Sequence, residues 1–179
     1  MKRTARIALS GLMGALSLVC LLLTVFPFAT YALPALASVF LMPIVIECGK
    51  KWALAAYAAV ALLALLIAPD LEAKFLFVFF FGYYPIVKSW SESQNRVVEW
   101  VCKLGVFNAA VVAAYALISH IGFSLEAFEL PGVSAPMTVI LAAFLVAGNV
   151  VFVLYDVALT RLLPLYFARF QPLLRRLFR

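Results

Sequence analysis

Charged residues are scarce in this 179-residue chain, in which only 12% are Asp, Glu, Lys or Arg. Soluble domains carry roughly a quarter. Apolar residues make up 67% of the chain, more than a water-soluble domain of this length can bury. This composition excludes an ordinary soluble domain and predicts an all-α polytopic membrane protein whose main surroundings are the lipid bilayer. The net charge of +6 does not indicate nucleic-acid binding, because the basic residues lie between apolar segments and suit anionic lipid headgroups.

Residues that commonly carry chemistry are few as well. The three cysteines, Cys20, Cys48 and Cys102, show no CxxC or histidine spacing, so we expect packing residues and no metal site. The single histidine, His120, adjoins Ser119, and neighbours on a helix point about 100° apart, so the two are not a catalytic pair. HExxH, GxSxG and P-loop motifs are all missing from the sequence. We therefore expect neither enzymatic activity nor a cofactor.

The apolar segments divide the chain into helices. The first uncharged run, residues 7–46, would be about 60 Å long as one helix, twice the roughly 30 Å of a bilayer core, so it must fold back. Pro27 and Pro34 mark that turn. Residues 1–160 are thus predicted to form one compact bundle, and residues 161–179 a basic amphipathic tail in the membrane interface, interrupted at Pro164 and Pro172. The six predicted transmembrane helices span about 5–26, 33–48, 52–68, 74–89, 97–120 and 135–160.

The basic residues predict the orientation of this bundle. Every Lys and Arg except Lys74 falls on the side that holds the N-terminus, the 50–51 turn, the 88–103 loop and the tail. The positive-inside rule then predicts a multi-pass protein of the cell membrane with both termini in the cytoplasm. A cleaved signal peptide is the competing interpretation of the basic start, but the apolar region that follows is far longer than a usual signal sequence.

The stretch Phe75–Lys88 joins an aromatic block to a tyrosine pair and follows a small charged segment. On the predicted orientation, this charged segment lies at the outer rim together with the ends of the loop between the last two helices. Aromatic walls with a few polar groups are typical of small-molecule pockets, although outer loops are polar in any membrane protein and phenylalanines commonly face lipid. The candidate ligand-binding residues are Lys74, Phe75, Phe79, Tyr83, Asn108, His120, Glu126 and Asn149.

Polar residues inside apolar helices need partners. Asn108 and Asn149 are expected at similar depth on antiparallel neighbours, which predicts a hydrogen bond between them, with a ligand contact as the alternative. Asp156 and Glu47 are expected near the cytoplasmic boundary. The basic residues expected to pair with them are Arg161, Lys50 and Lys51.

Small residues follow one face of the first helix, at Ala8, Gly11 and Ala15. Such spacing lets a second helix approach closely. The spacing does not decide whether that helix belongs to this chain or to a partner.

Taken together, the segments ARIALSGLMGA, FGYYPIVK and GNVVFVLYD, the Pro-bracketed first outer loop and the turn at Gly49 resemble the substrate-binding S components of energy-coupling-factor (ECF) transporters. The resemblance covers nearly the whole chain. It implies a membrane subunit that captures a vitamin-like nutrient, while a separate coupling protein and ATPase subunits drive uptake. It also implies that Ala8, Gly11 and Ala15 meet the coupling protein, although the family's usual form there is Ala-xxx-Ala. The chain lacks the histidine-rich N-terminal ligand of metal-specific members, which argues against a metal substrate.

The alternative function is a small membrane scaffold of the cell-envelope machinery, of the rod-shape protein MreD type. The two hypotheses differ in their interior. A binding subunit needs an enclosed outer pocket formed by the fourth to sixth helices, whereas a scaffold needs a filled interior and a functional lateral or cytoplasmic face.

Overall fold

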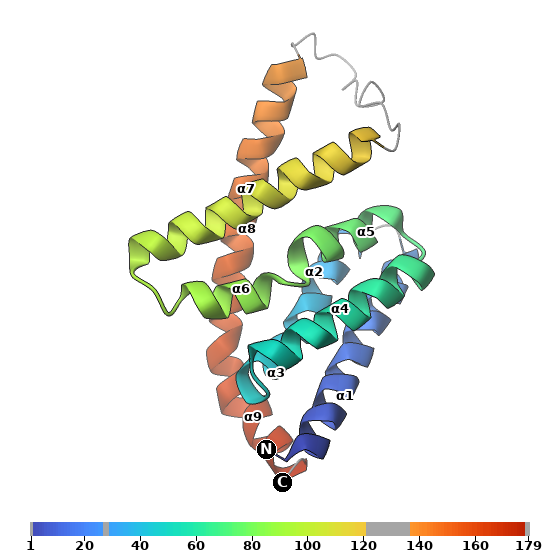
Figure 1. Ribbon diagram of the computed structural model, residues 1–179, viewed down its shortest axis with the longest axis vertical. Coiled ribbons are helices and arrows are strands. Elements are labelled where there is room, and N and C mark those ends of the chain that lie inside the picture. The colour runs from blue at the N-terminus through green and yellow to red at the C-terminus, as the bar shows by residue number, and fades with distance from the viewer. Residues whose placement is uncertain (1, 27–28, 121–136, 178–179) are drawn as a thin grey trace.

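The computed structural model describes residues 2–26, 29–120 and 137–177, and every regular element in these ranges is helical (Figure 1). Counting α2 with α3, α5 with α6, and α8 with α9, the described residues form six helical segments, as expected. The elements are α1 (Arg3–Leu22) with a 3-10 turn (Leu23–Val25), α2 (Ala32–Val39), α3 (Met42–Glu47), α4 (Lys50–Ile67), α5 (Leu71–Leu76) with a π-helical turn (Phe77–Phe81), α6 (Tyr84–Ser91), α7 (Arg96–His120), α8 (Met137–Leu165) with a π-helical segment (Tyr166–Phe170), and α9 (Gln171–Leu177).

Four helical stretches are long and apolar enough to cross a membrane. They are Arg3–Val25, Lys50–Ile67, Arg96–Ala114 and Ala142–Leu174, with mean hydropathies between 1.6 and 2.2. This result confirms the all-α class and supports a membrane location, but it bears out only four of the six expected spans. The two remaining segments, α2–α3 and α5–α6, are each broken near the middle.

The N-terminal half packs through small residues. Helix α1 lies along α2 and α4, and its buried face includes Leu9, Met13 and Gly14. A Cβ atom placed on Gly14 would lie 3.4 Å from Cγ2 of Val60 on α4, an ordinary contact at a close crossing. Gly49 precedes α4 with a φ of 94°, a left-handed conformation that glycine adopts without steric cost and that permits the tight turn from α3.

The expected helix at 74–89 is in fact three pieces. Asp70 caps α5 by accepting hydrogen bonds from the backbone N–H groups of Glu72 (2.9 Å) and Ala73 (3.3 Å). The chain then widens into the π-helical turn, where the Gly82 N–H donates to the Phe77 carbonyl at 2.8 Å. Pro85, which has no N–H and fits the first turn of a helix, starts α6 afresh.

The break at Gly82 has a cause elsewhere in the chain. Tyr57 of α4 lies against this turn and donates its hydroxyl to the Val78 carbonyl at 2.6 Å. A Cβ atom on Gly82 would come within 2.6 Å of the Tyr57 ring. The glycine therefore allows α4 to approach the π-helical turn, and the Tyr57 hydroxyl is bonded to one of its carbonyls.

At the other end of α5, the Tyr31 hydroxyl donates to the Glu72 carboxylate at 3.2 Å. The Glu72 charge, followed by partial burial, raises the pKa of the Tyr31 phenol. Tyr31 therefore stays protonated and keeps this hydrogen bond at neutral pH.

An aromatic core joins the π-helical turn to the last two long helices. Ring centroids of Phe80 and Phe107 lie 4.8 Å apart, and those of Phe107 and Phe152 lie 4.9 Å apart in a stacked arrangement. Tyr84 packs edge-on against Phe152 at 5.1 Å. These rings fill the space between α6, α7 and α8.

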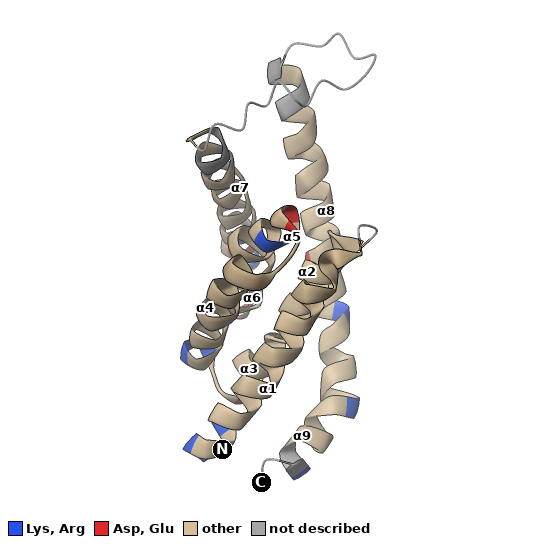
Figure 2. Ribbon diagram, turned by 90° about the vertical axis from the view of Figure 1, so that its right-hand side faces the viewer, with Lys and Arg blue, Asp and Glu red and all other residues tan. Residues whose placement is uncertain are grey.

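The last helix is longer than expected. It does not end near Thr160 but continues through Pro164 and the π-helical segment into α9 (Figure 1). Gln171 on α9 donates to the Glu47 carboxylate of α3 at 2.7 Å, which ties this end to the N-terminal half. Basic segments gather toward the end of the molecule that holds both termini (Figure 2). The interfacial location of residues 161–179 and the cytoplasmic orientation stay predictions.

Replacing Gly82 with Ala is expected to destabilise the protein by about 1–3 kcal/mol, because the new methyl group overlaps the Tyr57 ring. The measurement is thermal unfolding in detergent. Gly105→Ala is the matched control, since Gly105 is also helical and has open space where a Cβ would lie. Equal unfolding midpoints for the two variants would contradict the close approach of Tyr57.

Candidate functional site

Asp156 is the centre of a buried polar network that joins α6, α7 and α8. It lies near the middle of the apolar stretch Ala142–Leu174 and is 4% exposed. Its Oδ1 accepts hydrogen bonds from the Lys88 ammonium at 2.5 Å and from the Tyr84 hydroxyl at 2.6 Å. Its Oδ2 accepts from the Lys103 ammonium at 3.1 Å. One carboxylate therefore binds two lysines from two different helices.

The two lysines have several oxygen partners each. Besides the Asp156 carboxylate, Lys88 donates to the Thr160 hydroxyl at 2.8 Å and to the Asp156 carbonyl at 3.4 Å, and it pairs with Glu92 at 2.8 Å. Lys103 donates to Asp156 and, at 2.5 Å, to Glu99, and it lies 3.8 Å from Glu92. An ammonium group has three N–H donors, so those of Lys88 are all used within the network.

Helical spacing explains how these side chains meet. Glu92 follows Lys88 by four residues, and Lys103 follows Glu99 by four, so each pair lies on one helix face. Thr160 follows Asp156 by one turn and donates its hydroxyl to the Asp156 carbonyl at 2.9 Å, which leaves its lone pairs toward Lys88. Contacts within single helices therefore position part of the site.

The charges of the network do not balance. Two lysines face three carboxylates, Asp156, Glu92 and Glu99, which gives a net charge of −1 when all five groups are ionised. Glu92 is the outermost of the three, with 34% of its side chain exposed. Water compensates part of this excess charge, because Glu92 and Glu99 are partly exposed. Glu92 is therefore the accessible end of a network with excess negative charge.

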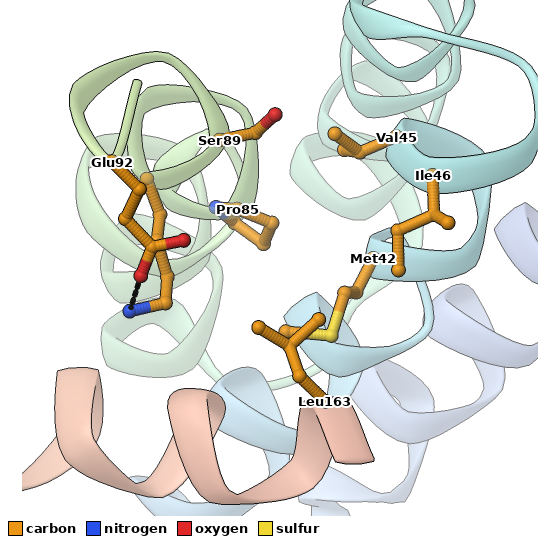
Figure 3. A pocket seen from close by; sticks show the side chains of 8 residues that line it. Met42, Val45, Ile46, Pro85, Ser89, Glu92 and Leu163 are labelled. Atoms are coloured by element: carbon orange, nitrogen blue, oxygen red, sulfur yellow. Dashed lines mark ion pairs between the residues drawn. The ribbon is translucent and has the colours of Figure 1, made fainter. Parts of the chain in front are cut away.

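A pocket of about 160 Å³ adjoins the network between α3, α6 and α8 (Figure 3). Lys88, Ser89 and Glu92 form its polar side. Its apolar side is formed by Met42, Val45, Ile46, Pro85 and Leu163. In Figure 3 the Lys88–Glu92 ion pair lies across the pocket from Val45 and Ile46.

A second polar contact confirms a prediction from the sequence. Asn108 on α7 and Asn149 on α8 exchange two hydrogen bonds of 3.1 Å through their amide groups. Each side chain also donates to the carbonyl four residues earlier in its own helix, at 2.8 Å for Asn108 and 2.7 Å for Asn149. The amide groups therefore satisfy each other inside the bundle, and their role as ligand contacts stays a prediction.

The other candidate ligand residues are less concentrated than expected. Phe75 and Phe79 pack against each other with ring centroids 6.1 Å apart, and Tyr83 packs edge-on against Tyr57 at the same distance. His120 is exposed, and its Nδ1 lies 3.0 Å from the Ala116 carbonyl of its own helix. Lys74 is half-buried on α5, and Glu126 lies outside the described residues. The contacts that the described part of the chain shows among these residues are local pairs, and their role in binding a ligand stays a prediction.

The pairing predicted for Asp156 is wrong. Its cationic partners are Lys88 and Lys103, and Arg161 is exposed one turn beyond. Sequence reasoning missed both lysines as site residues because each was counted as part of a solvated loop. The spacing of Glu99 and Lys103, four residues apart, was a signal in the sequence that this loop continues into a helix. The contacts to Asp156 could not be found in that way, because they join residues 53 and 68 positions apart in the sequence.

Comparisons with known proteins supply no further assignment: no protein-family model matches the chain, and searches of curated proteins and of solved structures found no match.

Replacing Asp156 with Asn is expected to cost about 3–5 kcal/mol of stability, because it leaves two buried lysines without their shared counter-charge. Thermal unfolding in detergent measures the loss. Glu72→Gln, which removes an exposed carboxylate at the other end of the molecule, is the control and should change stability by less than about 1 kcal/mol. A small, equal effect of both substitutions would show that the network is not the main link among α6, α7 and α8.

Proposed function

We propose that this chain is the substrate-binding subunit of an ATP-driven uptake system for a small, vitamin-like nutrient. On this proposal it works with a separate coupling protein and ATPase subunits of the ECF type. That the chain is a helical membrane protein is supported by the four apolar helices. The role in nutrient uptake is supported by the resemblance of its sequence segments and by one structural observation, the exposed face of α1.

Helix α1 has two different faces. Leu9, Met13 and Leu21 are buried against the rest of the molecule. The opposite small-residue face, Ala8, Gly11 and Ala15, is exposed, and no atom lies within 4 Å of a Cβ placed on Gly11. The described part of the chain therefore does not use this face for its own packing. A smooth, unused helix face supports docking by a helix of another protein.

The scaffold alternative is favoured by a different observation. The space between the π-helical turn, α7 and α8 is filled by Phe80, Phe107 and Phe152, with Tyr84 beside them. A filled interior at this depth is the feature expected of a scaffold. Both functions use a partner helix, so the presence of a bound small molecule discriminates between them.

Replacing Gly11 with Leu is expected to abolish co-purification with a coupling protein while leaving the fold intact. The reason is that the leucine enters open space within this chain but obstructs an approaching helix. Gly105→Leu is the matched control, because Gly105 is exposed on α7 and has equally open surroundings. The measurement is affinity purification of tagged protein from its native membrane. If both variants retain the partner, the docking face lies elsewhere.

Mass spectrometry of small molecules released from the detergent-purified protein tests the transport role. A single defined molecule is expected with the wild type and reduced several-fold with Lys74→Gln, which removes the one cation at the predicted outer rim. Lys51→Gln, an exposed residue near the start of α4, is the control and should retain the molecule. Absence of any bound molecule, together with an intact partner complex, would favour the scaffold.

A further inference from the structure

We propose that the pocket between α3, α6 and α8 binds a small primary ammonium compound with a short apolar chain, its ammonium group against Glu92 and its chain among Met42, Ile46 and Leu163. This site is at the opposite end of the α5–α6 segment from Lys74. The inference therefore stands independently of the nutrient site in the proposed function.

The charge of the neighbouring network specifies a cation. Asp156 is fully used by Lys88, Lys103 and Tyr84, so it has no free oxygen to offer a ligand. Glu92 differs, because both of its lysine contacts involve Oε1. Its second oxygen is the unused acceptor on the polar side of the pocket, and the excess charge of −1 favours a positively charged partner there.

The same charges exclude an anionic ligand. Lys88 lines the pocket, but its ammonium group already donates to the Asp156 carboxylate, the Asp156 carbonyl and the Thr160 hydroxyl, and it pairs with Glu92. A carboxylate or phosphate entering the pocket would meet Glu92 without a free lysine donor. Ser89, the remaining polar residue of the pocket wall, can add a hydroxyl acceptor for an ammonium N–H.

The walls and the volume specify an organic cation of limited size. Five of the eight lining residues are apolar, so a hydrated inorganic ion would leave most of the pocket without compatible contacts. The volume of about 160 Å³ exceeds what a single water needs, yet it is below the roughly 300–1,000 Å³ typical of pockets for drug-sized ligands. A chain of about four carbons on an ammonium group fits these limits.

A soluble short-chain amine supplies this chemistry. The ethanolamine headgroup of a membrane lipid fits less well, because its phosphate lies two carbons from the ammonium group and would meet the apolar wall of the pocket. Because α3, α6 and α8 meet beside the exposed turn at Glu92, a soluble amine can reach the pocket. On the predicted orientation this end faces the cytoplasm.

The test is calorimetric titration of the full-length, delipidated protein in detergent with butylammonium, butanol and butyrate. Butylammonium is expected to bind at least tenfold more tightly than either of the others. Glu92→Gln, which keeps the side-chain size, should weaken butylammonium at least tenfold, whereas Glu72→Gln, outside the pocket, should leave it unchanged. Leu163→Trp, which fills the apolar side without touching the charges, should also abolish binding and serves if Glu92→Gln fails to fold.

Native mass spectrometry of protein purified before delipidation tests the lipid alternative. Phosphatidylethanolamine that is retained by the wild type and lost in both pocket variants would assign the pocket to a lipid headgroup and overturn the soluble amine. Equal binding of butanol and butylammonium, or binding that survives both pocket variants, would also overturn the proposal. So would the absence of butylammonium binding.

Discussion

The pairing of two buried lysines with one aspartate is the constraint on which the C-terminal half of this molecule depends. Lys88, Lys103 and Asp156 come from three helices, and each has a side chain no more than 6% exposed. An unpaired charge at such a position costs several kcal/mol, so the three helices are stable only in an arrangement that brings these groups together.

The helices that carry these charges bury little apolar surface against the rest of the chain. Only 11% of the α7 window and 17% of the α8 window are buried within the chain, against 39% for α1. Polar contacts therefore determine how α7 and α8 are placed, and the Asn108–Asn149 pair sets their relative register a turn or two further along.

The two halves of the chain are thus held together by different physical means. In the N-terminal half, small residues such as Gly14 and Ala64 let α1 and α4 approach closely, and dispersion contacts supply the stability. In the C-terminal half, ion pairs and aromatic rings supply most of the contacts between helices. The stacked pair of Phe107 and Phe152 lies beside Gly148, where a Cβ would be 3.2 Å from the Phe107 ring, so this helix crossing also leaves little free space. Much of the apolar surface of α7 and α8 is exposed, including Val112, Val146 and Val150, because their contacts with the rest of the chain are concentrated on one narrow face.

The helices and the Asn108–Asn149 contact could be predicted from the sequence, because both depend only on the lengths of the apolar segments and on positions along them. Apolar length determines the helices, and equal depth on antiparallel neighbours determines the asparagine pair. The break at Gly82 could not be predicted, because its cause is the ring of Tyr57 on another helix.

The partners of Asp156 were mispredicted for a similar reason. Counting outward from the basic tail placed Asp156 near Arg161, whereas α8 continues past Pro164 and brings Asp156 level with Lys88 and Lys103. The candidate ligand residues Lys74, Phe75, Phe79 and Tyr83 were predicted from an aromatic segment beside a charged one, and such a pattern does not specify which side chains converge.

Helix α6 is the element that connects the two halves. Adjacent residues on a helix point about 100° apart, and this separation directs Tyr83 toward Tyr57 of α4 while Tyr84 points at Asp156 of α8. The helix begins at Tyr84, with two residues between it and the π-helical turn that ends at Phe81, so it is not continuous with α5. Any change in charge at Glu92 acts through Lys88 on the same helix and reaches Asp156 within two contacts. The pocket beside Glu92 therefore adjoins the same helix that places Tyr84 and Lys88 against Asp156.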